Sequence, residues 1–410
     1  MSFKRKVGYL FAFLLVVVGV AIYAYSCGNE FVFDDEVQVV GNPAIHSLAN
    51  LPYFFRGSTY ANGNSMVGAG IYYKPFTVLT YALLWWLFPD TPMGFHGWQL
   101  FLAITNALLV FRFLRTFMSE RAAGIAALIF LAHPINTETI AYIGDLQDVL
   151  YTFFGLLALN WLVTARAGLR NGLITMLLLL SSLMAKESGL LYLAATCGWS
   201  LYIRPTWRRS AFAASFSALG IYLGLRLGLA HMSHLVYQAN QIGRADWFGR
   251  LITAPLVLGM YLGKFFVPLH FTTTQDWIVN ELSLPQFWLP LLALVVLIAA
   301  HIWYLRRLGP LSARGRIYGY FSAWLIVGLL FHSHILVPLD GTFADRWFYF
   351  PCIGLCAMLG FWFESTLQRG WALGLAAIVV CALGARSFVR ASDWVDGFTL
   401  AEHEDRKAHV

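Results

Sequence analysis

Long apolar runs alternate with short polar segments along almost the entire chain. A helix that crosses the hydrocarbon core of a bilayer needs about 20 mostly apolar residues. Eleven segments approach or reach this length, and each is predicted to span the membrane: 7–26, 97–117, 122–133, 148–165, 171–184, 188–203, 210–229, 286–305, 317–335, 348–365 and 370–388. The pattern therefore predicts an all-α polytopic membrane protein.

Basic residues indicate the orientation of these spans, because cytoplasmic loops are enriched in Lys and Arg. The first span follows the stretch FKRK, which places the N-terminus in the cytoplasm. Alternation then puts the arginine-rich loops on that same side; they hold Arg112, Arg115 and Arg121, Arg166 and Arg170, Arg204, Arg208 and Arg209, and Arg306, Arg307, Arg314 and Arg316. With eleven spans the C-terminus lies outside.

Two further apolar stretches, 75–88 and 253–268, are predicted to be interfacial or re-entrant helices. Both are short, and counting either as a span would turn the arginine-rich loops outward. The Trp85–Trp86 pair suits the headgroup layer. We expect one membrane domain, 1–388, and an extracytoplasmic tail, 389–410; the long outer loops are 27–96 and 230–285.

Composition agrees with this prediction and argues against other classes of protein. Of the 410 residues, 59% are hydrophobic and only 12% are charged, whereas a soluble domain averages roughly 25% charged residues. The net charge of +7 is carried largely by short loops, so membrane topology explains it and nucleic acid is not an expected partner. The uncharged run 7–27 is typical of a signal anchor.

Ionisable residues gather at the predicted outer face. A charge within a span costs about 2.5–3.5 kcal/mol on insertion scales, so such residues usually face a cavity or a partner. Those at this boundary are Asp34, Asp35, Glu36, Lys74, Glu138, Asp145, Asp148, Lys186, Glu187, Asp345 and Arg346. Carboxylates beside lysine and arginine at one membrane boundary predict a site that handles an anionic group.

Six motifs occur in an order that resembles a known family: FVFDDEVQVVGNP, YYKPFTVLTY, LAHPINTETIAYIGDLQDVL, MAKESG, RLITAPLVLGMYLGKFFVP and ADRWFYFPCIG. With the tail RSFVRASDWVDGFTLAEHEDRKAHV, they resemble the membrane half of the transmembrane and tetratricopeptide-repeat (TMTC-type) O-mannosyltransferases and their bacterial relatives, within the GT-C glycosyltransferase superfamily. The resemblance covers nearly the whole chain. It implies an enzyme that moves a sugar from a polyprenyl-phosphate carrier to a protein hydroxyl on the extracytoplasmic side.

The resemblance also implies roles for single residues. Asp34 takes the place of the catalytic base, and the motifs Lys186–Glu187 and Asp345–Arg346 match two further family motifs. Three positions depart from the family pattern, namely Asn136, Leu146 and His334. Because of these departures, mannose is not carried over as the donor sugar.

General chemistry suggests how these residues would work. An attacking hydroxyl needs a base within hydrogen-bond reach, which is the role expected for Asp34, with Asp35 orienting the acceptor or a metal. A leaving phosphate needs cations, so Arg346, Lys186 and, third, Lys74 are the expected phosphate ligands. The supporting acids are Glu138, Asp148, Glu187 and Asp345. One base and direct displacement predict inversion, by analogy with single-displacement glycosidases.

Each assignment has a structural alternative. The acids 34–36 could be a solvated helix end, and Lys186 could pair locally with Glu187. Arg346 could pair with Asp340 or Asp345, and Glu138 could cap its loop. The alternative functions are the same chemistry on a lipid or glycan acceptor, a lipid-linked sugar transporter or flippase, and a non-catalytic scaffold.

Cofactor and location follow less directly from the residues. No cofactor is certain and a divalent metal stays open: His231-x-x-His234 and His332-x-His334 have suitable spacing, although boundary histidines are more often structural. The compact loops favour a bacterial inner membrane with a periplasmic site over an endoplasmic reticulum membrane with a lumenal one.

Overall fold

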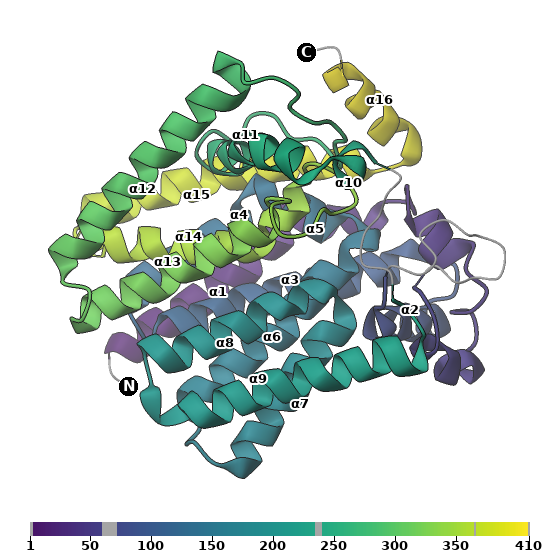
Figure 1. The fold of residues 1–410 in the computed structure, drawn as a ribbon, viewed down its shortest axis with the longest axis horizontal. Coiled ribbons are helices and arrows are strands. Elements are labelled where there is room, and N and C mark those ends of the chain that lie inside the picture. The colour runs from purple at the N-terminus through teal and green to yellow at the C-terminus, as the bar shows by residue number, and fades with distance from the viewer. Residues whose placement is uncertain (1–2, 60–71, 234–239, 365, 409–410) are drawn as a thin grey trace.

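A computed structural model describes residues 3–59, 72–233, 240–364 and 366–408, and these ranges are mainly helical and contain no β-strand (Figure 1). The α-helices are α1 (Phe3–Tyr23), α2 (Pro75–Leu87), α3 (Pro92–Leu114), α4 (Glu120–Ala132), α5 (Thr137–Ala141), α6 (Leu146–Thr164), α7 (Leu169–Ala185), α8 (Leu190–Tyr202), α9 (Arg208–Leu223), α10 (Gln241–Arg244), α11 (Trp247–Phe266), α12 (Leu289–Leu308), α13 (Ala313–Phe331), α14 (Tyr349–Trp362), α15 (Gly370–Ala391) and α16 (Gly397–Ala408). Short 3-10 or π helices join them, and these include η1 (Ala24–Gly28), η2 (Glu36–Val40), η5 (Ile143–Asp145), η6 (Glu187–Gly189), η8 (Gly224–Leu229), η10 (Asp345–Phe348) and η12 (Ser392–Trp394).

Each of the eleven predicted spans is helical over most of its length. Six helical segments in the described ranges are long and apolar enough to cross a bilayer; a seventh counts if the pair Glu120–Ala132 and Pro134–Ala141, bent by 52°, is one span. The predicted fold class, a helical polytopic membrane protein, is therefore confirmed. The count of eleven and the sides on which the termini lie stay predictions.

The two stretches predicted to be interfacial are also helices. Residues 75–88 form α2, and residues 253–268 fall within a longer helix, α11, which begins at Trp247. The earlier start has a local cause: the Asp246 carboxylate accepts a hydrogen bond from the Gly249 N–H at 2.7 Å and so caps the first turn. Where α2 and α11 lie in a bilayer stays a prediction.

Buried polar side chains join the helices to one another. Asn106 on α3 donates to the Val149 carbonyl of α6 at 2.9 Å, and Ser182 on α7 donates to the Tyr151 carbonyl of α6 at 2.8 Å. Interhelical bonds of this kind stabilise membrane bundles by roughly 0.6–2 kcal/mol each. They fix the helices around α6 relative to one another, and with them the loops at the helix ends.

Those loops bring the polar motifs to one end of the bundle. Helix α6 packs against α3 and α7, and α14 packs against α4 and α13. Helix α4 ends and α6 begins beside the segment 133–145, α7 ends at Ala185, and η10 leads into α14. The arginine-rich turns, such as 115–119 between α3 and α4, follow the opposite helix ends.

Candidate active site

Arg346 lies at the centre of a charged cluster. Its Nη1 is 2.6 Å from Oε1 of Glu138, on α5, and its Nε is 3.5 Å from Oδ1 of Asp145, the last residue of η5. Its Nη2 also donates to the Thr274 hydroxyl at 2.8 Å. Both carboxylates are buried, so this guanidinium offsets charges that would be expensive on their own.

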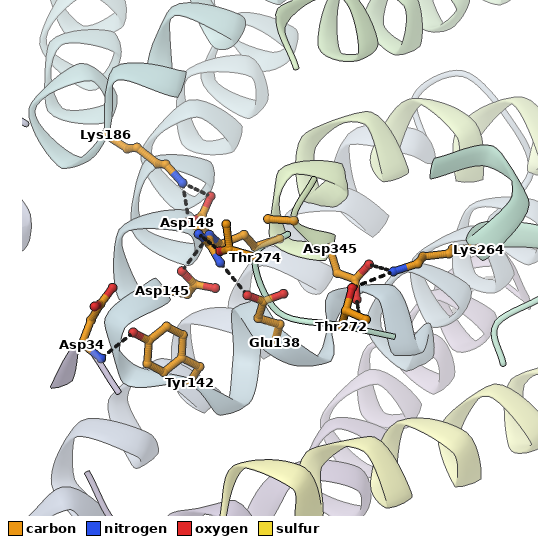
Figure 2. Close-up of polar contacts among 12 residues, drawn as sticks. Asp34, Glu138, Tyr142, Asp145, Asp148, Lys186, Lys264, Thr272, Thr274 and Asp345 are labelled. Carbon is orange, nitrogen blue, oxygen red and sulfur yellow. Dashed lines mark hydrogen bonds and ion pairs between the residues drawn. The ribbon is translucent and has the colours of Figure 1, made fainter. Parts of the chain in front are cut away.

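Lys186 forms the second ion pair of this cluster. It follows the last residue of α7, and its Nζ lies 2.8 and 2.6 Å from the two carboxylate oxygens of Asp148, in the first turn of α6. Asp148 follows Asp145, a partner of Arg346, by three positions in the chain, so the lysine and arginine pairs lie close together (Figure 2). The alternative of a local pair between Lys186 and Glu187 is therefore wrong.

Glu187 points to a different partner. Its Oε1 is 3.0 Å from Nη1 of Arg226, a buried residue of η8, and accepts a hydrogen bond from the Tyr73 N–H at 2.9 Å. The adjacent Lys186 and Glu187 thus serve two neighbouring clusters. Tyr73 directly precedes Lys74, so Glu187 also anchors the backbone that carries this third predicted cation.

Asp345 faces away from Arg346. Its Oδ1 is 2.8 Å from Nζ of Lys264, on α11, and its Oδ2 accepts a hydrogen bond from the Thr272 N–H at 3.3 Å. Figure 2 shows this pair apart from Glu138, Asp145 and Asp148. The alternatives in which Arg346 pairs with Asp340 or Asp345 are wrong, because its carboxylate partners are Glu138 and Asp145.

The adjacent acids of the first loop have different surroundings. Asp35 is fully buried, and its Oδ2 accepts a hydrogen bond from the Val32 N–H at 3.0 Å. Asp34 is partly exposed, and its N–H donates to the Tyr142 hydroxyl at 3.1 Å. A solvated helix end, the structural alternative for residues 34–36, is therefore wrong for Asp35.

Burial raises the pKa of Asp34 above its usual value, and the charge of Asp340 raises it further. Arg346, a hydrogen bond from the Tyr142 hydroxyl and Lys74 act in the opposite direction and lower this pKa. Burial raises the pKa of Asp35 well above its usual value, although the N–H groups of Val32 and Gly144 oppose that shift. Asp34 is thus the acid whose charge is influenced by Arg346 and Lys74, with a pKa moved toward the range of a general base.

Lys74 differs from the other two predicted cations. It is 5% exposed, and its Nζ lies 4.0 Å from the ring centroid of Tyr72, whose hydroxyl donates a hydrogen bond to Asp340. In the described part of the chain no carboxylate oxygen lies within 4.0 Å of its Nζ. Burial lowers the pKa of Lys74, Glu187 raises it and Lys186 lowers it.

The histidine motifs do not form a metal centre in the described residues. The rings of His332 and His334 contact the carbonyl oxygens of Gly328 and Thr342 at 2.8 and 2.7 Å. His234 lies outside the described residues. Nowhere in those residues do three or more His, Cys, Asp or Glu side chains come together as metal ligands.

Sequence reasoning did not assign a role to several residues of the site. Tyr142, Asp145 and Thr274 contact predicted site residues, and Lys264 and Arg226 pair with predicted acids. Lys264 could have been noticed, since a lysine within an apolar helix usually has a partner. The partners themselves depend on helix packing, which local sequence does not specify.

Comparison with known proteins shows relatives of one kind. No family model matches the chain. The chain is 25% identical over 414 residues to "Protein O-mannosyl-transferase F38B6.6" of Caenorhabditis elegans, with 94% of this chain and 56% of that protein covered. It is 27% identical over 197 residues to "Protein O-mannosyl-transferase TMTC3" of Mus musculus, with 46% and 21% covered.

A solved structure shares the fold. The oligosaccharyltransferase AglB of Archaeoglobus fulgidus, in complex with an inhibitory peptide and a dolichol-phosphate, is 13% identical with a TM-score of 0.50; 97% of this chain and 57% of that chain are covered. At this identity the likeness concerns the fold alone. These findings confirm the resemblance to TMTC-type O-mannosyltransferases and to the GT-C fold. The predicted enzyme class, a glycosyltransferase, agrees with these relatives, of which the chain spans about half the length or less.

Proposed function

We propose that this chain is a membrane glycosyltransferase that moves a sugar from a polyprenyl-phosphate carrier to a hydroxyl group of a protein acceptor. The observation that carries the proposal is the convergence of an acid and three cations from distant segments. Asp34 is hydrogen-bonded to Tyr142, in the segment whose Glu138 and Asp145 hold Arg346. Asp148, at the end of the same segment, holds Lys186, and the adjacent Glu187 holds the backbone beside Lys74. The names of the curated relatives agree with this reaction.

Asp34 is the proposed base. It is partly exposed and hydrogen-bonded to Tyr142, in the segment that holds Arg346, whereas Asp35 is enclosed by its own turn. A base must take the proton from the acceptor hydroxyl while the phosphate leaves from the opposite side of the anomeric carbon. A single carboxylate in this role implies inversion at that carbon.

Lys74 is the proposed principal ligand of the donor phosphate. Arg346 and Lys186 are already balanced by Glu138, Asp145 and Asp148, so most of their charge is neutralised within the protein. Lys74 is buried and ion-paired to none of the described carboxylates, which leaves its charge for an incoming anion. Arg346 and Lys186 then orient the cluster, and Asp148, Glu138 and Glu187 hold these cations and the loop before Lys74.

The location of the ionisable residues favours an enzyme over a transporter. A transporter would place such residues near the middle of the bilayer, on broken helices. Here Asp148, Lys186 and Arg346 lie at the start of α6, after the end of α7 and before α14. Glu138 is the exception, because it lies on α5 beyond the bend that follows α4. We place this end of the bundle on the extracytoplasmic side, in a bacterial inner membrane, because the arginine-rich turns follow the opposite helix ends.

A transfer assay with the purified, nanodisc-embedded protein tests the proposal. The donor is a radiolabelled polyprenyl-phosphate sugar, with mannose first, and the acceptors are serine- and threonine-containing peptides beside lipid and glycan acceptors. Asp34→Asn should lower transfer about 100-fold or more, the usual contribution of a general base. Asp90→Asn is the matched control: Asp90 is exposed, its φ is 52°, which asparagine tolerates, and it should change transfer less than about twofold.

The outcomes separate the parts of the proposal. No transfer by the wild-type protein to any acceptor, although it binds polyprenyl phosphate, would favour the scaffold or the transporter. Transfer only to lipid or glycan would change the acceptor and keep the chemistry. Full activity of Asp34→Asn would exclude Asp34 as the base.

A further inference from the structure

The segment that follows α15 reaches the candidate active site. Trp394, the last residue of η12, is buried, and its ring stacks on that of Tyr142 with centroids 4.8 Å apart and planes 19° from parallel. This contact joins two positions about 250 residues apart in the chain. Nothing in the proposed chemistry requires a tryptophan from the segment after α15 at this point.

Tyr142 is held from several directions. Its hydroxyl accepts a hydrogen bond from the Asp34 N–H at 3.1 Å, and its carbonyl accepts one from the Gln99 side chain at 2.6 Å. Gln99 lies on α3 and fixes the backbone of Tyr142, whereas Trp394 covers the face of the ring. The ring therefore lies between the tail and the turn that carries Asp34 (Figure 2 shows Asp34 and Tyr142).

The turn that carries Asp34 depends on local support. Phe33, directly before it, has a φ of 55°, a left-handed conformation that is costly for a bulky residue and persists only where the surroundings enforce it. Its ring lies 6.2 Å from that of Tyr142. The same loop contacts the tail a second time, because the Glu30 N–H donates to the Val395 carbonyl at 2.9 Å.

The tail segment is itself fixed. Arg390 is buried, its guanidinium lies 5.8 Å from the ring centroid of Trp394, and its Nη1 is 2.7 Å from a carboxylate oxygen of Asp393. Trp394 is therefore a rigid surface against which the Tyr142 ring can rest. Such support is what a catalytic group needs when small displacements are expensive for the reaction.

We propose that Trp394 is a positioning residue that holds Tyr142 against the turn carrying Asp34, so that the segment 392–395 sets the geometry of the catalytic base. The inference rests on the proposed function for the role of Asp34. It assigns to the tail segment after α15 a part in catalysis that neither the motifs nor the comparisons indicate. It also means that a displacement of the tail would be transmitted to the base.

Three variants test whether Trp394 and Tyr142 support the turn that carries Asp34. Trp394→Ala removes the stacked ring, Trp394→Phe keeps an aromatic surface, and Tyr142→Phe keeps the stack and removes the hydroxyl. We expect Trp394→Ala to lower kcat 10- to 100-fold with little change in the KM for the donor, and Trp394→Phe to recover most of that loss. The double variant Trp394→Ala with Tyr142→Phe should lose little more than the more impaired single variant, because both act through one contact.

The pH profile gives a readout that a merely structural role would not move. The groups that act on Asp34 are Arg346, Lys74, Asp340 and the Tyr142 hydroxyl, and its chain neighbours are Asp35 and Glu36. Of these, the hydroxyl lowers the pKa of Asp34, so Tyr142→Phe should move the acid limb of kcat/KM to higher pH. Trp394→Ala should move it in the same direction, and Trp394→Phe should move it less.

Hydrogen exchange of residues 29–41 tests the support without any activity. Exchange should rise in Trp394→Ala relative to both the wild type and Trp371→Ala, a control at the far end of α15 where the side chain is 62% exposed. If exchange is faster in Trp394→Ala but the wild-type protein transfers no sugar, Trp394 supports the turn that carries Asp34 and the proposed function is rejected. Unchanged exchange, or a Trp394→Ala activity that falls only with the folded fraction and keeps its pH profile, would overturn the inference.

Discussion

The guanidinium of Arg346 and the carboxylate of Glu138 lie 2.6 Å apart, although their residues are separated by 208 positions in the chain. The pair joins η10 to α5, and Asp145 approaches the same guanidinium at 3.5 Å. All three side chains are largely buried, so each charge depends on the others for compensation. In the proposed glycosyltransferase site, the charged side chains of Arg346, Glu138 and Asp145 would thus hold the fold together beside the donor phosphate.

A double-mutant cycle tests this dependence. Arg346→Met leaves Glu138 and Asp145 without their cation and should lower the free energy of unfolding by about 3–5 kcal/mol, the usual cost of breaking a buried pair. Adding Glu138→Gln removes one of the stranded charges and should restore part of the stability but no activity. Thermal unfolding in one detergent measures both effects. Additive losses would show that the two side chains do not depend on each other.

The two lysines of the site should respond differently to the loss of charge. Lys74→Met removes a buried cation that has none of the described carboxylates within 4.0 Å, so stability should hold or rise, while the donor-phosphate affinity falls about tenfold or more. Lys186→Met strands the buried Asp148 carboxylate and should lower the melting temperature. Isothermal titration with polyprenyl phosphate and thermal unfolding distinguish them. Equal loss of affinity without loss of stability in both variants would contradict the proposed ranking.

Asp34 and Lys74 should shape the pH dependence of transfer. The base must be ionised, and the pKa of Asp34 is raised, so kcat/KM should rise with pH through a value above that of an ordinary aspartate. Lys74 must be protonated to bind the phosphate, and its pKa is lowered. Donor binding should therefore weaken as the pH rises through a value below the pKa of an ordinary lysine. Lys74→Arg keeps its charge and should move the alkaline limb upward. An unmoved alkaline limb would assign it to another group.

The sequence indicated much of this site because its motifs occur at predicted helix ends. Lys186 follows α7, Asp148 lies in the first turn of α6, and Arg346 precedes α14, so the alternating helices bring them to one end of the bundle. The pairing pattern was not predictable in the same way. Arg346 pairs with Glu138 and Asp145 rather than with a nearby aspartate, because the packing of α4, α6 and α14 decides which charges meet.

The lengths of single helices show a second limit of sequence reading. The predicted spans 188–203 and 348–365 contain α8 and α14, which have only 13 and 14 residues, fewer than the about 20 that a bilayer requires. The start of α11 at Trp247 was also missed, because the capping aspartate lies outside the apolar run that marked the helix. Length and local capping, rather than hydrophobicity, set these boundaries.

The two neighbouring acids of the first loop offer the sharpest test of the site. Asp35→Asn keeps an oxygen that can accept the Val32 N–H and removes a charge whose burial is unfavourable, since the pKa of Asp35 is raised. We therefore expect it to fold as well as the wild type and to retain transfer within about tenfold, whereas Asp34→Asn loses at least about 100-fold. Both variants are isosteric and adjacent, so each is the control for the other in the same transfer assay. If Asp35→Asn folds normally and is as inactive as Asp34→Asn, then Asp35 acts directly on the acceptor and its buried position must open during catalysis.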